Sequence, residues 1–312
     1  MRFRRRSRTL PVLVALLGGG LIALIGVQPG GAQEVSEFVH QRPLDLLGPE
    51  GNEQRVWVTY PRRADGRQHP PGRRYPVVIA LHGQGEARRG IARGSLGWNV
   101  DYRLPDAYGA FSRRRLSTFD FRSFVTPRHL SAINSRLRTA PFGGVMVVTP
   151  YTPDFLSQPD SEALARYGDW LAGDLLEAVR AEFDGAARTR RGTGIDGVSL
   201  GGMVSLHVGF AHPEAFGAVG AIQPAIGGQI PTLRDRAAEA QKSQPQAVRL
   251  LTSEFDHLRE TTERFSGSLC QVDVPHRLLV LPGRHDYAFN RGPGALELLR
   301  FAEEVLDQET LP

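Results

Sequence analysis

Cysteine is nearly absent from this sequence, since Cys270 is the only one among 312 residues. A single cysteine excludes an internal disulfide framework and any zinc or iron–sulfur site built on several cysteines. Lysine is equally scarce, because Lys242 is the only lysine among 38 basic residues. Residues 1–32 contain no acidic residue. The distribution of charge along the chain is therefore more informative than the net charge.

The net charge of +5 comes from the amino-terminal segment. Five arginines within residues 2–8 supply it, and the rest of the chain carries 33 basic and 33 acidic residues. A nucleic-acid-binding domain normally carries a basic stripe on its folded part. The neutral body therefore argues against nucleic acid as a partner, and its length suits one large globular domain.

The first residues have the pattern of a secretory signal peptide. An arginine-rich start precedes an apolar run from Leu10 to Val27, and small residues up to Ala32 follow. We expect residues 1–32 to be the signal and 33–312 the mature chain, which would be secreted, periplasmic or held in the cell envelope. The alternative is an uncleaved membrane anchor, although its apolar run is at the short limit for spanning a bilayer.

Strand-like and helix-like patterns alternate along the mature chain. Two continuous apolar runs, Tyr75–Leu81 and Val145–Thr149, predict strands buried on both faces. The apolar spacing of three or four residues from Ser161 to Phe183 predicts an amphipathic helix. Further strands are expected at residues 55–60, 193–198, 218–222, 248–252 and 276–281, and helices at 203–211 and 295–306. This alternation predicts an α/β fold with a mostly parallel central sheet and helices on both faces.

Residues 85–143 do not fit this alternation. The segment is rich in arginine and aromatic residues, and we expect short helices in it, including one at residues 128–137. Because it follows a predicted strand end, we interpret it as an insertion or lid over the active site. Its aromatic side chains would line an acyl pocket or pack in the core, the second being commoner. They are Trp98, Tyr102, Tyr108, Phe111, Phe119 and Phe121.

Residues 197–202 (GVSLGG) contain a G-x-S-x-G match centred on Ser199. A predicted strand precedes the match and a helical stretch follows, which is the context of a nucleophile elbow. The sharp turn pushes the serine oxygen out of the sheet, and close backbone approach there favours glycine. We therefore expect Ser199 to be a nucleophile. The alternative is a glycine-rich turn with an incidental serine.

Residues 82–85 (HGQG) directly follow the buried strand that ends at Leu81. In a hydrolase sheet this turn lies beside the nucleophile and gives one backbone N–H to the oxyanion hole, and the residue after the nucleophile gives the other. We assign these donors to Gln84 and Leu200, with Gly83 as the reserve for Gln84. His82 is expected to be a structural, hydrogen-bonded histidine.

His285 is the histidine best placed to act as a general base. It follows the last predicted strand, and this position satisfies the chain order serine, acid, histidine. The acid should follow the strand at 248–252, where Asp256 is our choice and Glu254 the reserve. The alternative for His285 is an ordinary surface-loop histidine.

Four stretches together carry a resemblance to a known family: YPVVIALHG (75–83), GVSLGG (197–202), AHPEAFGAVGAI (211–222) and GRHDYAFN (283–290). With them the chain resembles the esterase D and enterochelin-esterase-like branch of the α/β-hydrolases. That branch includes S-formylglutathione hydrolases, feruloyl and acetylxylan esterases, and mycolyltransferases. Two positions depart from its pattern: Ser253 replaces a glycine common before the acid, and Leu200 replaces a common methionine.

The residues and the resemblance together predict an exported serine esterase. Ser199, His285 and Asp256 would form the triad, and no metal or organic cofactor is expected because the triad generates its own nucleophile. The substrate would be a small-molecule or polysaccharide-linked ester. The alternatives are an acyltransferase to a sugar, a serine peptidase of the same fold, and a non-catalytic binding module on a hydrolase scaffold.

Overall fold

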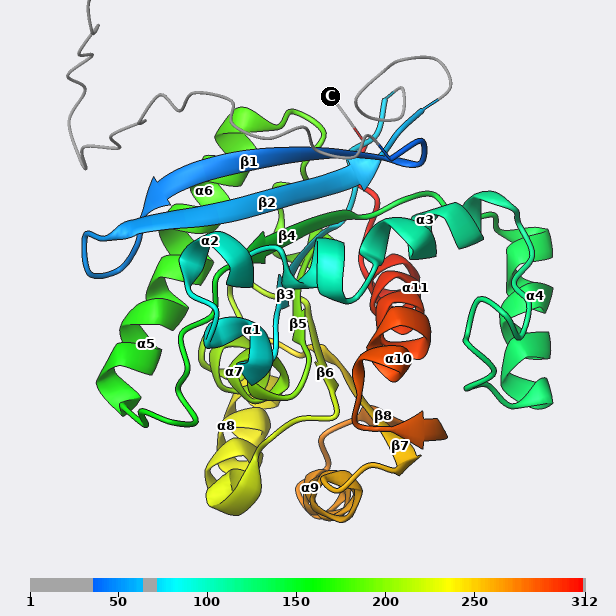
Figure 1. The fold of residues 1–312 in the computed structure, drawn as a ribbon. Coiled ribbons are helices and arrows are strands. Elements are labelled where there is room, and N and C mark those ends of the chain that lie inside the picture. The colour runs from blue at the N-terminus through cyan, green and yellow to red at the C-terminus, as the bar shows by residue number, and fades with distance from the viewer. Residues whose placement is uncertain (1–35, 64–71, 311–312) are drawn as a thin grey trace, which may run out of the picture.

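A single eight-stranded sheet runs through the molecule, with the strand order β1-β2-β4-β3-β5-β6-β7-β8 (Figure 1). The computed structural model describes residues 36–63 and 72–310, so the predicted signal peptide lies outside the described residues. The strands are β1 (Val39–Leu47), β2 (Glu53–Pro61), β3 (Val77–Leu81), β4 (Met146–Pro150), β5 (Thr193–Gly197), β6 (Ala218–Ile222), β7 (Ala247–Phe255) and β8 (His276–Arg284). In this order, the strands from β4 onward, which are β4, β3, β5, β6, β7 and β8, are parallel to one another. Strand β2 pairs antiparallel with both β1 and β4. The predicted α/β fold with a mostly parallel sheet is confirmed.

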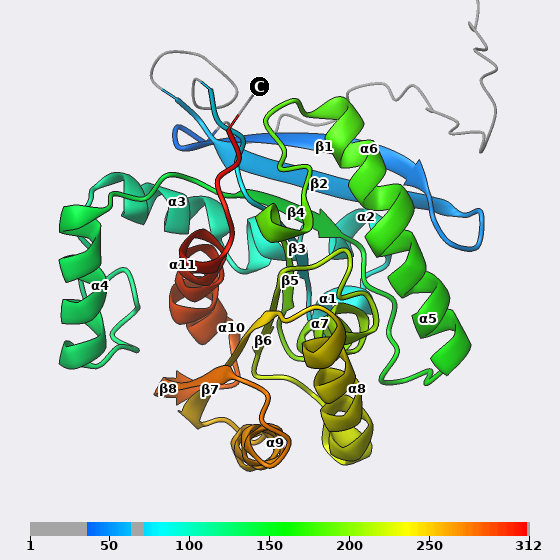
Figure 2. The ribbon, with the colours of Figure 1, turned by 180° about the vertical axis from the view of Figure 1, so that it is seen from behind.

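Helices cover both faces of the sheet, as Figures 1 and 2 show from opposite sides. They are α1 (Gln84–Ala87), α2 (Ile91–Gly94), α3 (Leu104–Ser112), α4 (Pro127–Thr139), α5 (Ser161–Trp170), α6 (Leu176–Glu182), α7 (Leu200–Ala211), α8 (Ile230–Ser243), α9 (Arg259–Cys270), α10 (Tyr287–Phe289) and α11 (Ala295–Val305). Short π-helical turns, η1 (Gly97–Asp101), η2 (Leu171–Leu175) and η5 (Asn290–Gly294), and short 3-10 turns, η3 (Arg190–Gly192) and η4 (Gly227–Gln229), complete the set. Within the described ranges, no helix has both the length and the apolar character that crossing a bilayer requires.

Alternating side chains of the central strands divide the core into two layers. Val77, Ile79 and Leu81 of β3 pack with α5 to α9, while Val78 and Ala80 pack with α3, α4 and α11. A strand buried on both faces needs apolar residues at every position, which is why β3 and β4 appear in the sequence as unbroken apolar runs. The sheet therefore gives a rigid platform whose loops carry the candidate site.

The segment 85–143 is divided between two locations. Its first part, α1 to η1, lies at the carboxyl end of β3, directly after the turn at residues 82–85. Its last helix, α4, lies at the side of the molecule beyond α11 (Figures 1 and 2), where His129 Nε2 is 2.8 Å from Glu297 Oε1. The helix expected at residues 128–137 is confirmed as α4.

The aromatic residues of this segment are mostly core residues. Five of the six named above have 3% exposure or less and belong to the layer with α11, whereas Phe119 is 87% exposed. Tyr108 and Phe111 also line a cavity of about 500 Å³ with Phe38 and Tyr75. That cavity lies at the amino ends of β3 and β4, and Ser199 lies at the opposite edge of the sheet. These side chains therefore stabilise the fold.

A buried ion pair crosses the sheet three residues before Ser199. Asp196 of β5 and Arg249 of β7 form it across β6, where Gly220 lies between them in the same cross-strand row. A Cβ atom at Gly220 would collide with the Asp196 carboxylate and with the Arg249 guanidinium. Because Gly220 has no side chain, the Asp196 carboxylate and the Arg249 guanidinium can come into contact across β6.

Candidate active site

Ser199 occupies the sharp turn between β5 and α7. Its backbone has φ 56° and ψ −111°, a conformation that costs a non-glycine residue about 1–3 kcal/mol. Two hydrogen bonds join the turn to the segment at the end of β6, Ser199 N–H to Ile222 O at 2.9 Å and Ala225 N–H to Ser199 O at 3.0 Å. A Cβ atom at Gly201 would lie 2.7 Å from His82 O, so the turn requires glycine there. The sequence motif thus corresponds to a strained elbow.

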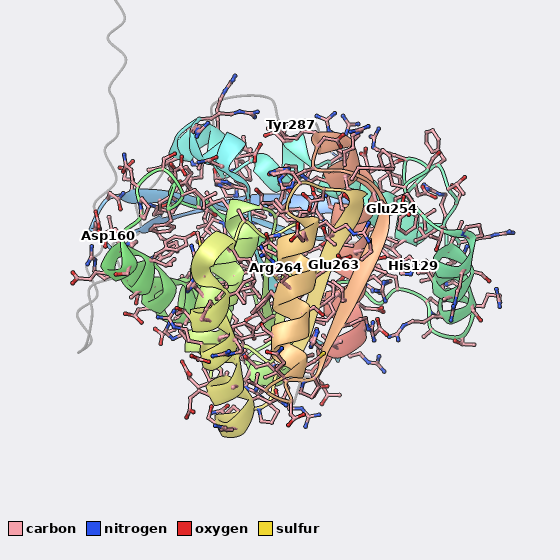
Figure 3. All side chains as sticks on the ribbon, turned by 90° about the horizontal axis from the view of Figure 1, so that it is seen from below. His129, Asp160, Glu254, Glu263, Arg264 and Tyr287 are labelled. Carbon is pink, nitrogen blue, oxygen red and sulfur yellow. The ribbon has the colours of Figure 1, made fainter. Side chains whose placement is uncertain are left out.

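His285 and Asp256 meet Ser199 in a hydrogen-bonded chain. His285 Nε2 is 3.2 Å from Ser199 Oγ, and His285 Nδ1 is 2.9 Å from Asp256 Oδ1. His285 follows β8 and Asp256 follows β7, so the carboxyl ends of three parallel strands bring the residues together. The structure places Asp256 against the imidazole, while the reserve acid Glu254 is exposed at the edge near the ends of β7 and β8 (Figure 3).

Asp256 is held as a carboxylate by its surroundings. Thr252 Oγ1 donates to its Oδ2 at 2.8 Å, and Leu258 N–H donates to its Oδ1 at 2.9 Å. Burial alone would raise the pKa of Asp256, but the hydrogen bonds from His285, Leu258 and Thr252 outweigh it and lower the pKa. Because Asp256 is ionised, the proton of a neutral His285 belongs on Nδ1, which leaves Nε2 free to accept one from Ser199.

The two predicted oxyanion donors stand at the first positions of α1 and α7. An N–H group at such a position has no acceptor within its own helix, so those of Gln84 and Leu200 are available to a ligand. Leu81 and Gly197 are paired across β3 and β5, which sets the two turns side by side. The reserve donor Gly83 is occupied, because its N–H donates to the Tyr102 hydroxyl at 3.0 Å.

A buried acidic network supports the first of these turns. Glu86 is 1% exposed and accepts hydrogen bonds from Tyr102 and, at 2.6 Å, from Tyr287. Tyr287 is the second residue after His285 and is labelled in Figure 3. Burial and the Glu86 carboxylate raise the pKa of Tyr287 to about 12, so it stays a hydrogen-bond donor at neutral pH. The network therefore joins the turn at Gly83 to the loop that carries His285.

Gln223 joins the remaining loops of the site. It is fully buried just after β6, with φ 47°, and its Nε2 donates to Ser253 Oγ at 2.8 Å and to Arg284 O at 3.0 Å. Arg284 directly precedes His285, and Ser253 lies three residues before Asp256. The sequence analysis missed Gln223 and the role of Glu86, because no local motif marks contacts between segments so far apart in the chain.

His82 is structural, as the sequence suggested. It is 1% exposed, its Nε2 accepts the Thr152 N–H at 2.9 Å, and its Nδ1 is 3.0 Å from Gly83 O. Burial lowers the pKa of His82 to about 4, so the ring is neutral at physiological pH. In the described part of the chain, the only His, Cys, Asp and Glu residues gathered closely enough to hold a metal ion are Asp256, His257 and His285.

Comparisons with known proteins find similarity in part of the sequence and in the fold. Residues 137–249 match the model of the family described as "Putative esterase", a stretch that contains Ser199 and ends before Asp256. No curated protein is similar enough in sequence to match the chain.

Three solved structures show the same fold. A ferulic acid esterase has a TM-score of 0.62 and 15% identity, covering 86% of this chain and 100% of its own. An S-formylglutathione hydrolase from Staphylococcus aureus has a TM-score of 0.54 and 16% identity, covering 89% and 100%. A fluorophosphonate-binding serine hydrolase from Staphylococcus aureus has a TM-score of 0.55 and 15% identity, covering 85% and 98%. The predicted resemblance to α/β-hydrolase esterases is confirmed, and the family match supports a carboxylic ester hydrolase.

Proposed function

We propose that this chain is an exported serine hydrolase that cleaves carboxylic esters through Ser199, His285 and Asp256. The observation that carries the proposal is the chain of two hydrogen bonds, 3.2 Å and 2.9 Å long, that ends on a serine in a strained elbow. Such a chain activates a hydroxyl group that is otherwise a weak nucleophile at neutral pH.

In the acylation step, Ser199 Oγ attacks the ester carbon while His285 Nε2 takes its proton. Asp256 stabilises the imidazolium that forms and fixes the ring orientation. The negative charge that develops on the carbonyl oxygen is received by the N–H groups of Gln84 and Leu200. The tetrahedral intermediate then collapses, and the alcohol leaves with the proton from His285. The product of this step is an acyl ester on Ser199.

Deacylation repeats these roles with water as the nucleophile. His285 removes a proton from the water, the same N–H groups hold the oxyanion, and Ser199 leaves with the proton. The acid product is released and the resting enzyme is restored. A ferulic acid esterase among the structures of similar fold favours an ester of a small organic acid, free or linked to a polysaccharide. Export is proposed from the signal-like residues 1–32.

The test is fluorophosphonate labelling of the purified protein beside Ser199→Ala and Ser205→Ala. Ser205 is a matched control, because it lies on α7 and its buried hydroxyl donates to Gly220 O at 2.7 Å. We expect wild type and Ser205→Ala to be labelled, and Ser199→Ala to lose label and at least about a thousandfold of p-nitrophenyl acetate hydrolysis. Labelling of Ser199→Ala would show that a different serine is the nucleophile. A folded wild-type protein that neither labels nor hydrolyses would refute the proposal.

A further inference from the structure

A second histidine lies beside the triad and has no part in the proton transfers described above. His257 follows Asp256 directly, its side chain is 70% exposed, and its Nδ1 is 3.7 Å from Asp256 Oδ1. Its ring centroid is 4.7 Å from that of His285. The exposed His257 thus lies next to both members of the Asp256–His285 pair.

The three side chains have the donor set and the spacing of a transition-metal site. One ligand atom from each of Asp256, His257 and His285 can be chosen so that all lie within 4.8 Å of one another. Ligands about 2.0–2.2 Å from a tetrahedral ion are roughly 3.3–3.6 Å apart. The distances of 2.9 Å and 3.7 Å from Asp256 Oδ1 to the two Nδ1 atoms lie on either side of that value. Two imidazoles and one carboxylate are suitable ligands for Zn²⁺ and similar transition-metal dications. They are poor ligands for Mg²⁺ and Ca²⁺.

We propose that Asp256, His257 and His285 form an inhibitory binding site for Zn²⁺ or a similar transition-metal dication. The inhibition rests on the proposed hydrolase function, whereas the binding does not. The ion would occupy the position of the proton between His285 Nδ1 and Asp256, with His257 as the third ligand and water as the fourth.

The inhibition follows from the tautomer of the bound imidazole. A neutral ring that binds metal through Nδ1 carries its single proton on Nε2. His285 therefore loses a proton at Nδ1 and gains one at Nε2, so the proton count of the ring is unchanged. Nε2 then faces Ser199 Oγ as a donor and cannot remove its proton. The ion stops catalysis without occupying the space of the substrate.

The test uses the full chain and two separate readouts. Calorimetric titration of Ser199→Ala with Zn²⁺ measures binding without any activity. Fluorophosphonate labelling and p-nitrophenyl acetate hydrolysis by wild type measure inhibition by Zn²⁺, with Mg²⁺ as the control ion. His257→Asn removes one ligand, and His212→Asn is the matched control. His212 also lies beside two carboxylates, those of Asp169 and Glu214, but within the described residues these three are not grouped closely enough to hold a metal ion.

We expect Zn²⁺ to slow labelling and hydrolysis by wild type and His212→Asn, with full recovery after chelation. His257→Asn should keep its activity without Zn²⁺ and need at least about tenfold more Zn²⁺ for half-inhibition, because losing even an outer-shell partner costs about 10–100-fold in metal affinity. Absence of Zn²⁺ binding to Ser199→Ala, or equal inhibition of His257→Asn and wild type, would overturn the proposal. A wild-type protein inactive without metal would refute the hydrolase function instead, and calorimetry would still decide the binding.

Discussion

Arg249→Met tests the ion pair that crosses the sheet behind Ser199. In the described part of the chain, Arg249 Nε and Nη1 have no hydrogen-bond partner, so the guanidinium acts mainly through Asp196. Methionine fills a similar volume against Phe301, whose ring centroid lies 5.1 Å from the guanidinium carbon. The change therefore leaves a carboxylate that is 1% exposed without its cation. Breaking a buried pair in this way costs about 3–5 kcal/mol.

The cost should depend on pH in a defined direction. Burial already raises the pKa of Asp196 in spite of Arg249, and loss of the cation raises it further. An acid whose pKa is raised in the folded state lowers stability above that pKa, and the penalty disappears as the pH falls toward the unfolded value. The deficit should thus shrink from pH 7 to pH 5.

Urea unfolding followed by tryptophan fluorescence measures this deficit at both pH values. The double variant Asp196→Asn, Arg249→Met removes both charges and should recover most of the stability lost by the single variant. Three results would refute the reasoning: a cost below about 1 kcal/mol at pH 7, an equal cost at pH 5, or a double variant no more stable than Arg249→Met.

Two further predictions concern residues that position the site. Gln223→Ala frees the loop at Arg284, so kcat should fall about 10–100-fold with little change in KM, and the pH profile of kcat/KM should shift. Steady-state kinetics that stay within twofold of wild type would show that Gln223 does not position His285. Tyr102→Phe removes the acceptor of the Gly83 N–H and should lower kcat about tenfold, less than loss of a direct oxyanion donor. An unchanged kcat in a variant of normal stability would contradict that role.

The central part of the fold could be predicted because its signals are local. Strands β3 and β4 are unbroken apolar runs, and the α5 to α6 region has a regular apolar spacing. The analysis missed β1, α8 and α9. Strand β1 is an edge strand with Pro43 and few buried residues, and α8 and α9 bury only three and four residues each. An element that buries little leaves little pattern in its sequence.

The residues of the candidate site also differ in whether a local sequence pattern indicates them. Ser199, Asp256 and His285 could be located because each follows a recognisable strand, and the carboxyl ends of parallel strands meet at one edge. Gln223 and Tyr102 could not, because their partners lie 61 and 19 positions away and no spacing rule links them. Residues that carry chemistry leave motifs, whereas residues that hold loops together are visible only in three dimensions.

Under the proposed mechanism, the position of β8 makes the reactivity of Ser199 depend on a strand that follows it late in the sequence. Ser199 follows β5 near the middle of the sheet, but His285 follows β8, which is the last strand of the described residues and pairs among them with β7 alone. During synthesis Ser199 therefore emerges well before His285, the residue proposed to activate it. Under the proposed mechanism the hydroxyl would stay unreactive until β8 has docked, and a chain cut before residue 285 would lack the base that activates it. The extent of covalent labelling of Ser199 would then measure the fraction of molecules that have folded completely.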